Sequence, residues 1–141
     1  MALDNIFGIA GSALNAQTTR MNATASNLAN AGSVAGTEKD AFRGKRAVFK
    51  TILEMQQGTQ PSANNGGVKV TNLTDDPAPI TRMSDPGNPA ADKDGYVYLS
   101  NVNEMTEMVE MMAAARSYQN NVEVINTARQ LMMRTLDIIK S

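Results

Sequence analysis

The sequence predicts a mainly α-helical protein, in which long N- and C-terminal helices pair as a coiled-coil-like inner domain around a small, β-rich and irregular middle segment. Two observations support this fold class. Apolar residues recur every seven positions near both ends of the 141-residue chain, and such a repeat lines one face of a helix. All five prolines lie between the two repeats, where they interrupt regular structure. We therefore expect an N-terminal helix within residues 1–31, a middle segment at 32–100 and a C-terminal helix within 101–141.

The first helix is predicted over residues 3–30. Its main apolar column, at heptad spacing, consists of Phe7, Leu14, Met21 and Leu28. Asp4 or Asn5 is suited to cap the start, and Gly32 fits a left-handed stop just after the end. Small and polar residues fill the rest, so this helix alone in water should be marginally stable.

The second helix is predicted over residues 101–139 and has a longer repeat. One column consists of Met111, Tyr118, Ile125, Met132 and Ile139, and its companion of Met108, Ala115, Val122 and Leu136, with Arg129 as the polar member. Arg129 is expected either to extend outward or to pair with an acid on a partner helix. Further apolar residues widen the face, so we expect two or more neighbours to cover it. Asn101 is the expected N-cap, and Glu104, Glu107 and Glu110 complement the helix dipole.

The middle segment contains strand candidates at residues 47–55, 68–73, 78–83 and 96–99. The sequence Asp92-Lys93-Asp94-Gly95 is expected to form the turn into the last of these. A basic cluster is expected on a solvated strand or loop face, with contact to an acidic partner as the alternative; it consists of Arg43, Lys45, Arg46 and Lys50. The segment has few apolar residues, so it should need support from the helices or from neighbours.

The composition argues against an enzyme. The chain has no His and no Cys, which removes imidazole bases, thiol nucleophiles and the usual zinc ligands. The acid pairs Asp75–Asp76 and Asp92–Asp94 lie in loops, where solvation is a better interpretation than a metal or acid–base site. A net charge of −1 gives no reason to expect nucleic-acid binding, and no segment reaches the ~18 apolar residues that cross a bilayer. We expect no cofactor, no nucleic acid and no membrane span.

Both ends of the chain resemble one known family. Residues 11–31, with Ser-Asn-Leu-Ala-Asn at positions 26–30, resemble the signature of flagellar rod, hook and hook-associated axial proteins, and residues 108–128 resemble their closing helix. The opening at residues 5–12 and the segment Asp85–Val97 are similar to the proximal-rod branch of that family. The resemblance implies a structural subunit of the bacterial flagellar basal-body proximal rod, which polymerises through its terminal helices in the periplasm and transmits torque.

The resemblance also implies partners and a route. The partners would be other proximal and distal rod subunits, copies of the same chain and the flagellar type III export apparatus, with no cleaved signal peptide. The N-terminal sequence agrees, because Asp4 stands where a secretory signal is basic and Gly8 and Gly11 interrupt the apolar run.

The heptad columns and the motif residues together give the expected subunit interface. Its members are Phe7, Leu14, Met21, Asn27, Leu28, Asn30, Met108, Met111, Ala115, Tyr118, Val122, Ile125, Met132, Leu136 and Ile139. Methionines crowd the second helix and suit a deformable contact with dissimilar neighbours. We expect the termini to be poorly ordered in the free monomer and to fold on assembly. An Ile125→Asp change should permit export and block assembly. The alternative is a helical-hairpin adaptor or chaperone that forms a discrete oligomer.

Overall fold

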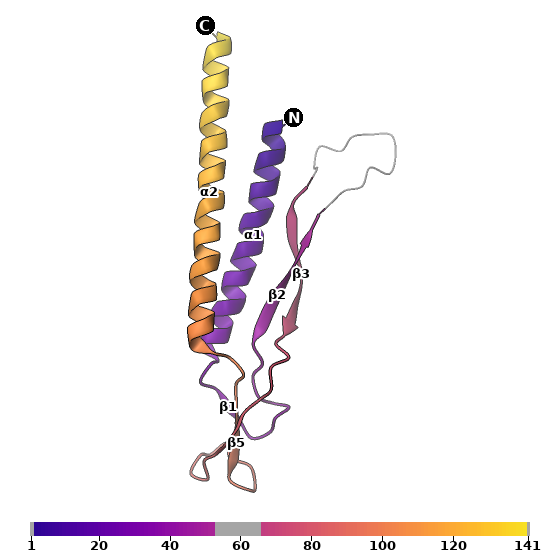
Figure 1. Ribbon diagram of the computed structural model, residues 1–141, viewed down its shortest axis with the longest axis vertical. Coiled ribbons are helices and arrows are strands. Elements are labelled where there is room, and N and C mark those ends of the chain that lie inside the picture. The colour runs from indigo at the N-terminus through magenta and orange to yellow at the C-terminus, as the bar shows by residue number, and fades with distance from the viewer. Residues whose placement is uncertain (1, 53–65, 141) are drawn as a thin grey trace, which may run out of the picture.

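Two long antiparallel helices dominate the computed structural model, which describes residues 2–52 and 66–140. Helix α1 (Ala2–Ala29) runs down the long axis, and α2 (Glu104–Lys140) returns beside it (Figure 1). The middle of the chain forms two small antiparallel sheets. This arrangement confirms the predicted fold class of long terminal helices around a β-rich middle.

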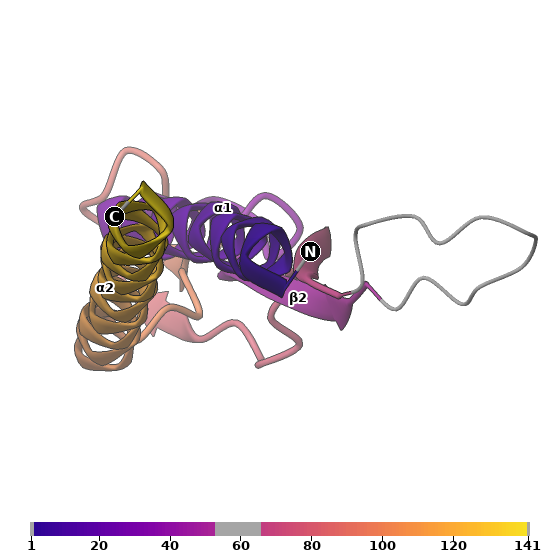
Figure 2. The same cartoon turned by 90° about the horizontal axis from the view of Figure 1, so that it is seen from above.

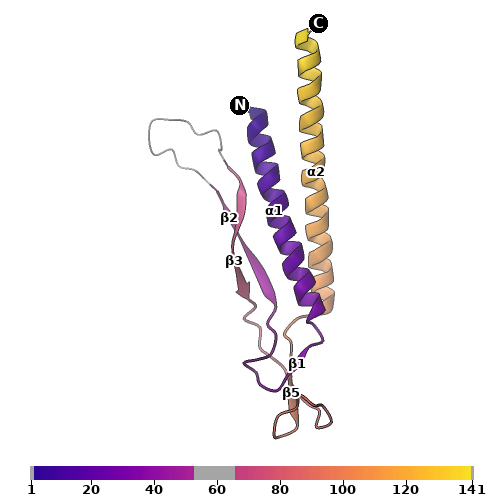
Figure 3. The same cartoon turned by 180° about the vertical axis from the view of Figure 1, so that it is seen from behind.

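The larger of the two β units is a hairpin that stands along α1. Strands β2 (Lys45–Thr51) and β3 (Val68–Asp75) pair antiparallel, with an irregularity between Val48 and Phe49. Seen from above, α1 lies between α2 and this hairpin (Figure 2), and the view from behind shows the same order (Figure 3). Helix α1 is therefore the central element of the molecule, with contacts to α2 and to both strands.

The second sheet lies at the base of the helices and has the strand order β1–β5–β4. Its strands are β1 (Val34–Ala35), β4 (Arg82–Ser84) and β5 (Tyr96–Leu99). The prediction for residues 96–99 is confirmed, whereas the candidate at 78–83 shrinks to β4, and β1 was too short to give a sequence signal. The predicted strand end at Met55 lies outside the described residues, as does Pro61, one of the five prolines of the middle segment.

Three predictions about the helix ends were wrong. Helix α1 begins before Asp4 and Asn5, so neither residue caps it. The N-cap of α2 is Asn103, whose Oδ1 accepts a hydrogen bond from the Thr106 backbone N–H at 3.0 Å; Asn101 is instead bonded to the hairpin. Gly32 is not among the glycines with positive φ. The chain leaves α1 through turn bonds, including Asn30 N–H to the Asn27 carbonyl at 3.1 Å.

The core is thin and made mainly of alanine. Among the described side chains, the buried apolar ones are Ala10, Ala16, Ala23, Ala41, Val97, Ala114 and Ala128. Two of these, Ala114 and Ala128, share a helix column with the buried Glu107, and this column faces α1. The predicted apolar columns of α2 lie on either side of this Glu107–Ala114–Ala128 column. The small alanines occupy the centre of the contact because they allow the two helix backbones to approach closely.

Candidate subunit interface and the joint that supports it

The helix pair leaves an apolar stripe uncovered on the first turns of α2. Met105, Met108, Val109 and Met112 are spaced as neighbours on one helix face, and their exposed fractions are 71%, 52%, 58% and 64%. Contiguous exposed apolar surface of this kind marks an interaction site. We call these four residues the methionine stripe.

A second apolar region lies where α2 extends beyond the start of α1 (Figure 1). The helices contain 28 and 37 residues, which correspond to about 42 Å and 55 Å at 1.5 Å per residue. Exposed side chains on the last part of α2 are those of Leu131, Met133, Leu136, Ile138 and Ile139. Where α1 begins, Ile6 and α2 enclose a groove of about 360 Å³ that is lined also by Val124, Ala128 and Leu131.

The predicted interface residues divide into three groups in the folded chain. The half-buried group, beside the helix contact, consists of Phe7, Leu14, Met21, Leu28, Asn30, Met111, Ala115, Tyr118, Val122, Ile125 and Met132. Met108, Leu136 and Ile139 are exposed. Asn27 alone is fully buried within the chain. Arg129 has an exposed side chain in the single chain, so its outward extension and its pairing with an acid on a partner helix both stay predictions.

Asn27 is buried because it holds three elements together. Its Oδ1 accepts a hydrogen bond from the Lys45 N–H at 2.7 Å, and its Nδ2 donates to the Lys45 carbonyl at 2.9 Å. The same Nδ2 donates to Glu107 Oε2 at 2.9 Å. One carboxamide thus connects α1 to the start of β2 and to the first turns of α2.

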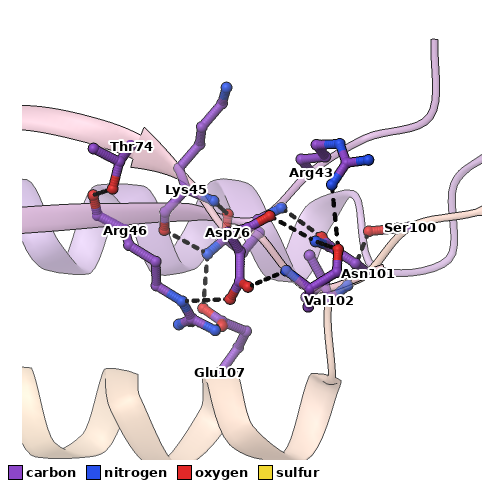
Figure 4. A network of polar contacts seen from close by, with 12 residues as sticks. Arg43, Lys45, Arg46, Thr74, Asp76, Ser100, Asn101, Val102 and Glu107 are labelled. Atoms are coloured by element: carbon purple, nitrogen blue, oxygen red, sulfur yellow. Dashed lines mark hydrogen bonds and ion pairs between the residues drawn. The ribbon is translucent and has the colours of Figure 1, made fainter. Parts of the chain in front are cut away.

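Charged groups complete this connection (Figure 4). Arg46, from β2, points toward Glu107 of α2, with Nη1 2.7 Å from Oε1, and its Nε donates to Asp76 Oδ2 at 3.0 Å. Glu107 is fully buried, as is Asn27. We call Asn27, Arg46, Asp76, Asn101 and Glu107 the polar joint.

Two pKa values in the polar joint are displaced from their usual range. Burial works against the charge of Arg46, but the hydrogen bond to Asp76 and the charges of Glu107 and Asp76 outweigh it and raise the pKa of Arg46. The hydrogen bond from the Ala78 N–H, at 2.9 Å, lowers the pKa of the Asp76 carboxyl; partial burial opposes this shift, and Arg46 reinforces it. Both displacements favour the charged forms.

Asn101 fastens the hairpin to the segment that leads into α2. Its Oδ1 accepts from the Gly44 N–H at 2.8 Å, and its Nδ2 donates to the carbonyls of Asp76 and Ala78 at 3.1 and 2.9 Å. Further up the molecule, an ion pair between Arg20 and Glu110 links the two helices. Near the far end of the hairpin, Ser12 Oγ of α1 accepts from the Val68 N–H at 3.1 Å.

The basic cluster is only partly solvated as predicted: Lys50 is exposed, whereas the other three cations are half-buried and contact acidic or carbonyl groups. Arg46 forms ion pairs with both Asp76 and Glu107. Lys45 pairs with Asp75, and Arg43 donates a hydrogen bond to the Ala78 carbonyl at 3.2 Å. Asp76 is likewise a structural residue and does not lie in a solvated loop. The role of Glu107 was also missed, although it shares one heptad column with Ala114 and Ala128, which was a usable signal.

The predicted turn at Asp92 is confirmed. Asp92 Oδ1 accepts hydrogen bonds from the N–H groups of Asp94 and Tyr96, both at 2.9 Å. Gly95, with φ of 79°, occupies the left-handed region that glycine tolerates. The second acid pair of the sequence analysis therefore builds the entry to β5.

Within residues 2–52 and 66–140, no group of three or more His, Cys, Asp or Glu side chains is placed so that it could hold a metal ion. Over the same residues, neither helix combines the length and apolar character needed to cross a membrane.

Comparisons with known proteins define the class to which this architecture belongs. Residues 7–36 match the family described as "Flagella basal body rod protein", and residues 93–138 match "Flagellar basal body rod FlgEFG protein C-terminal". Fold and motifs together define a flagellar rod-type axial protein. Proteins named "Flagellar basal-body rod protein FlgC" from Yersinia enterocolitica and Escherichia coli O6:H1 are each 50% identical over 138 residues, and that from Salmonella typhimurium is 49% identical, with 98% of each chain covered. The chain belongs to the FlgC family of flagellar basal-body rod proteins.

Proposed function

We propose that this chain is a structural subunit of the bacterial flagellar basal-body rod and that it joins neighbouring subunits through the exposed faces of α1 and α2. The methionine stripe carries this proposal, because each of its four residues is more than half exposed in the single chain. Moving an apolar side chain of this size from water into an interface contributes about 1.5–3 kcal/mol. Membership in the FlgC family supports the rod as the assembly concerned.

The finer parts of the proposal concern place and partners. The subunit belongs to the proximal, periplasmic part of the rod, transmits torque and contacts other proximal and distal rod subunits as well as copies of itself. It reaches the rod through the flagellar type III apparatus without a cleaved signal, and it has no catalytic activity. The terminal parts, 1–31 and 101–141, carry the assembly contacts, and residues 32–100 form a separate part.

Within α1 and α2, the contact surface includes the predicted heptad residues that retain exposed surface. The exposed members Met108, Leu136 and Ile139 are its strongest candidates, together with the rest of the methionine stripe. Asn27 contributes indirectly, because it is enclosed by its own chain. The adaptor or chaperone alternative is not favoured, since the relatives at 49–50% identity are named as rod proteins.

A charge placed in the methionine stripe tests the proposal. Val109→Asp changes a side chain that is 58% exposed, so the subunit should fold and be exported while rod assembly and swimming are lost, because the charge would have to be buried between subunits. The measurements are secretion of the subunit, recovery of rods in basal-body preparations and motility. Ile125→Asp is a less selective test, since Ile125 is half-buried beside the helix contact.

The matched control is Gln119→Asp, which adds the same charge at an exposed polar position of α2. It should leave rods and swimming unchanged. Normal swimming of cells that carry Val109→Asp would show that the methionine stripe is not an assembly surface.

A further inference from the structure

The buried carboxylate of Glu107 is not explained by an assembly surface. It lies in a helix contact whose other buried members on α2 are alanines, and its own exposed fraction is 0%. Its two partners come from different elements, Asn27 from α1 and Arg46 from β2. We propose that Glu107 makes the pairing of α1 with α2 conditional on the docking of the β2–β3 hairpin.

The two helices on their own would bury Glu107 without Arg46, because Arg46 comes from β2. Without the hairpin, Glu107 would keep, among its polar contacts to other elements within the described residues, the hydrogen bond from the neutral carboxamide of Asn27 at 2.9 Å. A buried carboxylate that has lost its cation is strongly destabilising, by about a hundredfold or more in the folded-to-unfolded ratio. The other fully buried side chains of α2 in this contact are alanines, and each buries little apolar surface, so they offset this loss poorly.

The dependence also holds in the opposite direction. The hairpin is anchored to the helix end of the molecule by the two bonds between Asn27 and Lys45 and by the ion pair of Arg46 with Glu107. Asn101 adds three bonds from the segment that precedes α2. If α2 is absent, Arg46 keeps Asp76 but loses Glu107. The hairpin and α2 therefore each supply a partner that a polar group of the other needs.

As a consequence, α1, the β2–β3 hairpin and α2, which are distant in sequence, should fold as one cooperative unit. A helix pair formed without the middle segment, or in a shifted register, would leave Glu107 without Arg46. Besides the Arg20–Glu110 ion pair, which is partly exposed, the buried alanines discriminate poorly between registers, and fixing a register is the best-attested role of a buried polar group. The inference depends on the geometry of the polar joint and does not depend on the proposed rod function.

Amide hydrogen exchange of the full-length chain along a sucrose titration tests this coupling, because sucrose favours the compact state. In the unmodified chain, the helices and the hairpin should gain protection at the same sucrose concentration. Arg46→Met should lower protection in both helices by about a hundredfold, although the change lies in β2. The double variant Arg46→Met with Glu107→Met should recover most of the helix protection, because no charge is then buried.

Lys50→Met is the matched control, since Lys50 is an exposed cation on the same strand and should leave the protection of the helices unchanged. The proposal is overturned if Arg46→Met affects the hairpin alone, if the double variant does not recover, or if helices and hairpin gain protection at different sucrose concentrations. Absence of protection in both elements at every concentration would also overturn it. None of these outcomes depends on rod assembly, so the result is separable from that of Val109→Asp.

Discussion

At the scale of single residues, the side-chain carboxamide of Asn27 imitates a backbone peptide group. Its carboxamide makes both a donor and an acceptor contact with Lys45, as an adjacent strand would, and still reaches Glu107. A carboxylate in its place would repel Glu107, and a shorter side chain would leave buried polar groups without partners. This gives a physical reason for Asn at the second position of the Ser-Asn-Leu-Ala-Asn motif.

Asn27→Ala should therefore lower the free energy of unfolding by about 2–4 kcal/mol, because it leaves buried groups of Lys45 and Glu107 unsatisfied. The measurement is urea unfolding followed by circular dichroism, in a sucrose buffer that favours the folded chain. Asn30→Ala serves as the control: the Asn30 side chain donates to the Ser26 carbonyl, one turn back in the same chain, at 2.8 Å, and its loss should change stability by less than about 1 kcal/mol. Equal effects of the two changes would contradict the role given to Asn27.

Acid should loosen the polar joint through Asp76. The pKa of Asp76 is lowered in the folded chain, so its contribution is present above the unfolded pKa of about 3.9 and is lost as the pH falls through the lower folded value. The free energy of unfolding should decline below about pH 4, and Asp76→Asn should make that decline shallower. Arg46, with its raised pKa, should add no pH dependence in the acid range. The same urea measurement from pH 7 to pH 3 checks this, and an identical decline in Asp76→Asn would refute it.

At the scale of elements, periodicity predicted the helices and local turn chemistry predicted the entry to β5. The heptad columns located α1 and α2 to within a few residues, because side chains seven apart share a helix face. The polar joint could not be predicted, because Asn27, Arg46 and Glu107 are brought together only by the tertiary fold. The same reason explains the misplaced cap, since a pattern of Asn residues does not reveal that Asn101 is held by the hairpin and Asn103 is free to bond Thr106.

The hairpin requires glycine where it meets α1. Gly67 has φ of 152°, and a Cβ there would lie 3.0 Å from Ser12 Oγ. Gly67→Ala should destabilise the folded chain by about 1–3 kcal/mol through backbone strain and displacement of Ser12. Gly32→Ala is the control, because a Cβ at Gly32 would meet nothing within 4 Å. Urea unfolding compares the two, and a smaller effect at Gly67 than at Gly32 would count against this geometry.

At the scale of the whole molecule, the chain is a long frame with little interior. Its buried apolar side chains, among the described residues, are all alanine except Val97, whereas large apolar side chains lie exposed along α2. Burial within one chain therefore stabilises the helices weakly, and the larger gain becomes available only when neighbours cover the exposed faces.

Free and assembled subunits should thus differ in order. In dilute buffer without osmolyte, we expect weak amide protection over residues 5–29 and 104–139, and strong protection of the same amides in assembled rods, because assembly supplies the missing burial. Hydrogen exchange with mass spectrometry measures both states. Strong protection of both helices in the dilute monomer would show that the subunit is already complete without neighbours.

The unequal lengths of the two helices bear on how this subunit should be labelled. The end of α2 extends beyond α1 and exposes the apolar side chains of Leu136, Ile138 and Ile139. A fluorescent tag fused there would sterically block the surface that neighbouring subunits are proposed to bind. The turn at residues 92–95 lies at the opposite tip of the long axis, and Lys93 and Asp94 face solvent. A small dye attached to Lys93 can therefore report the position of the subunit in a cell without covering the exposed apolar end of α2.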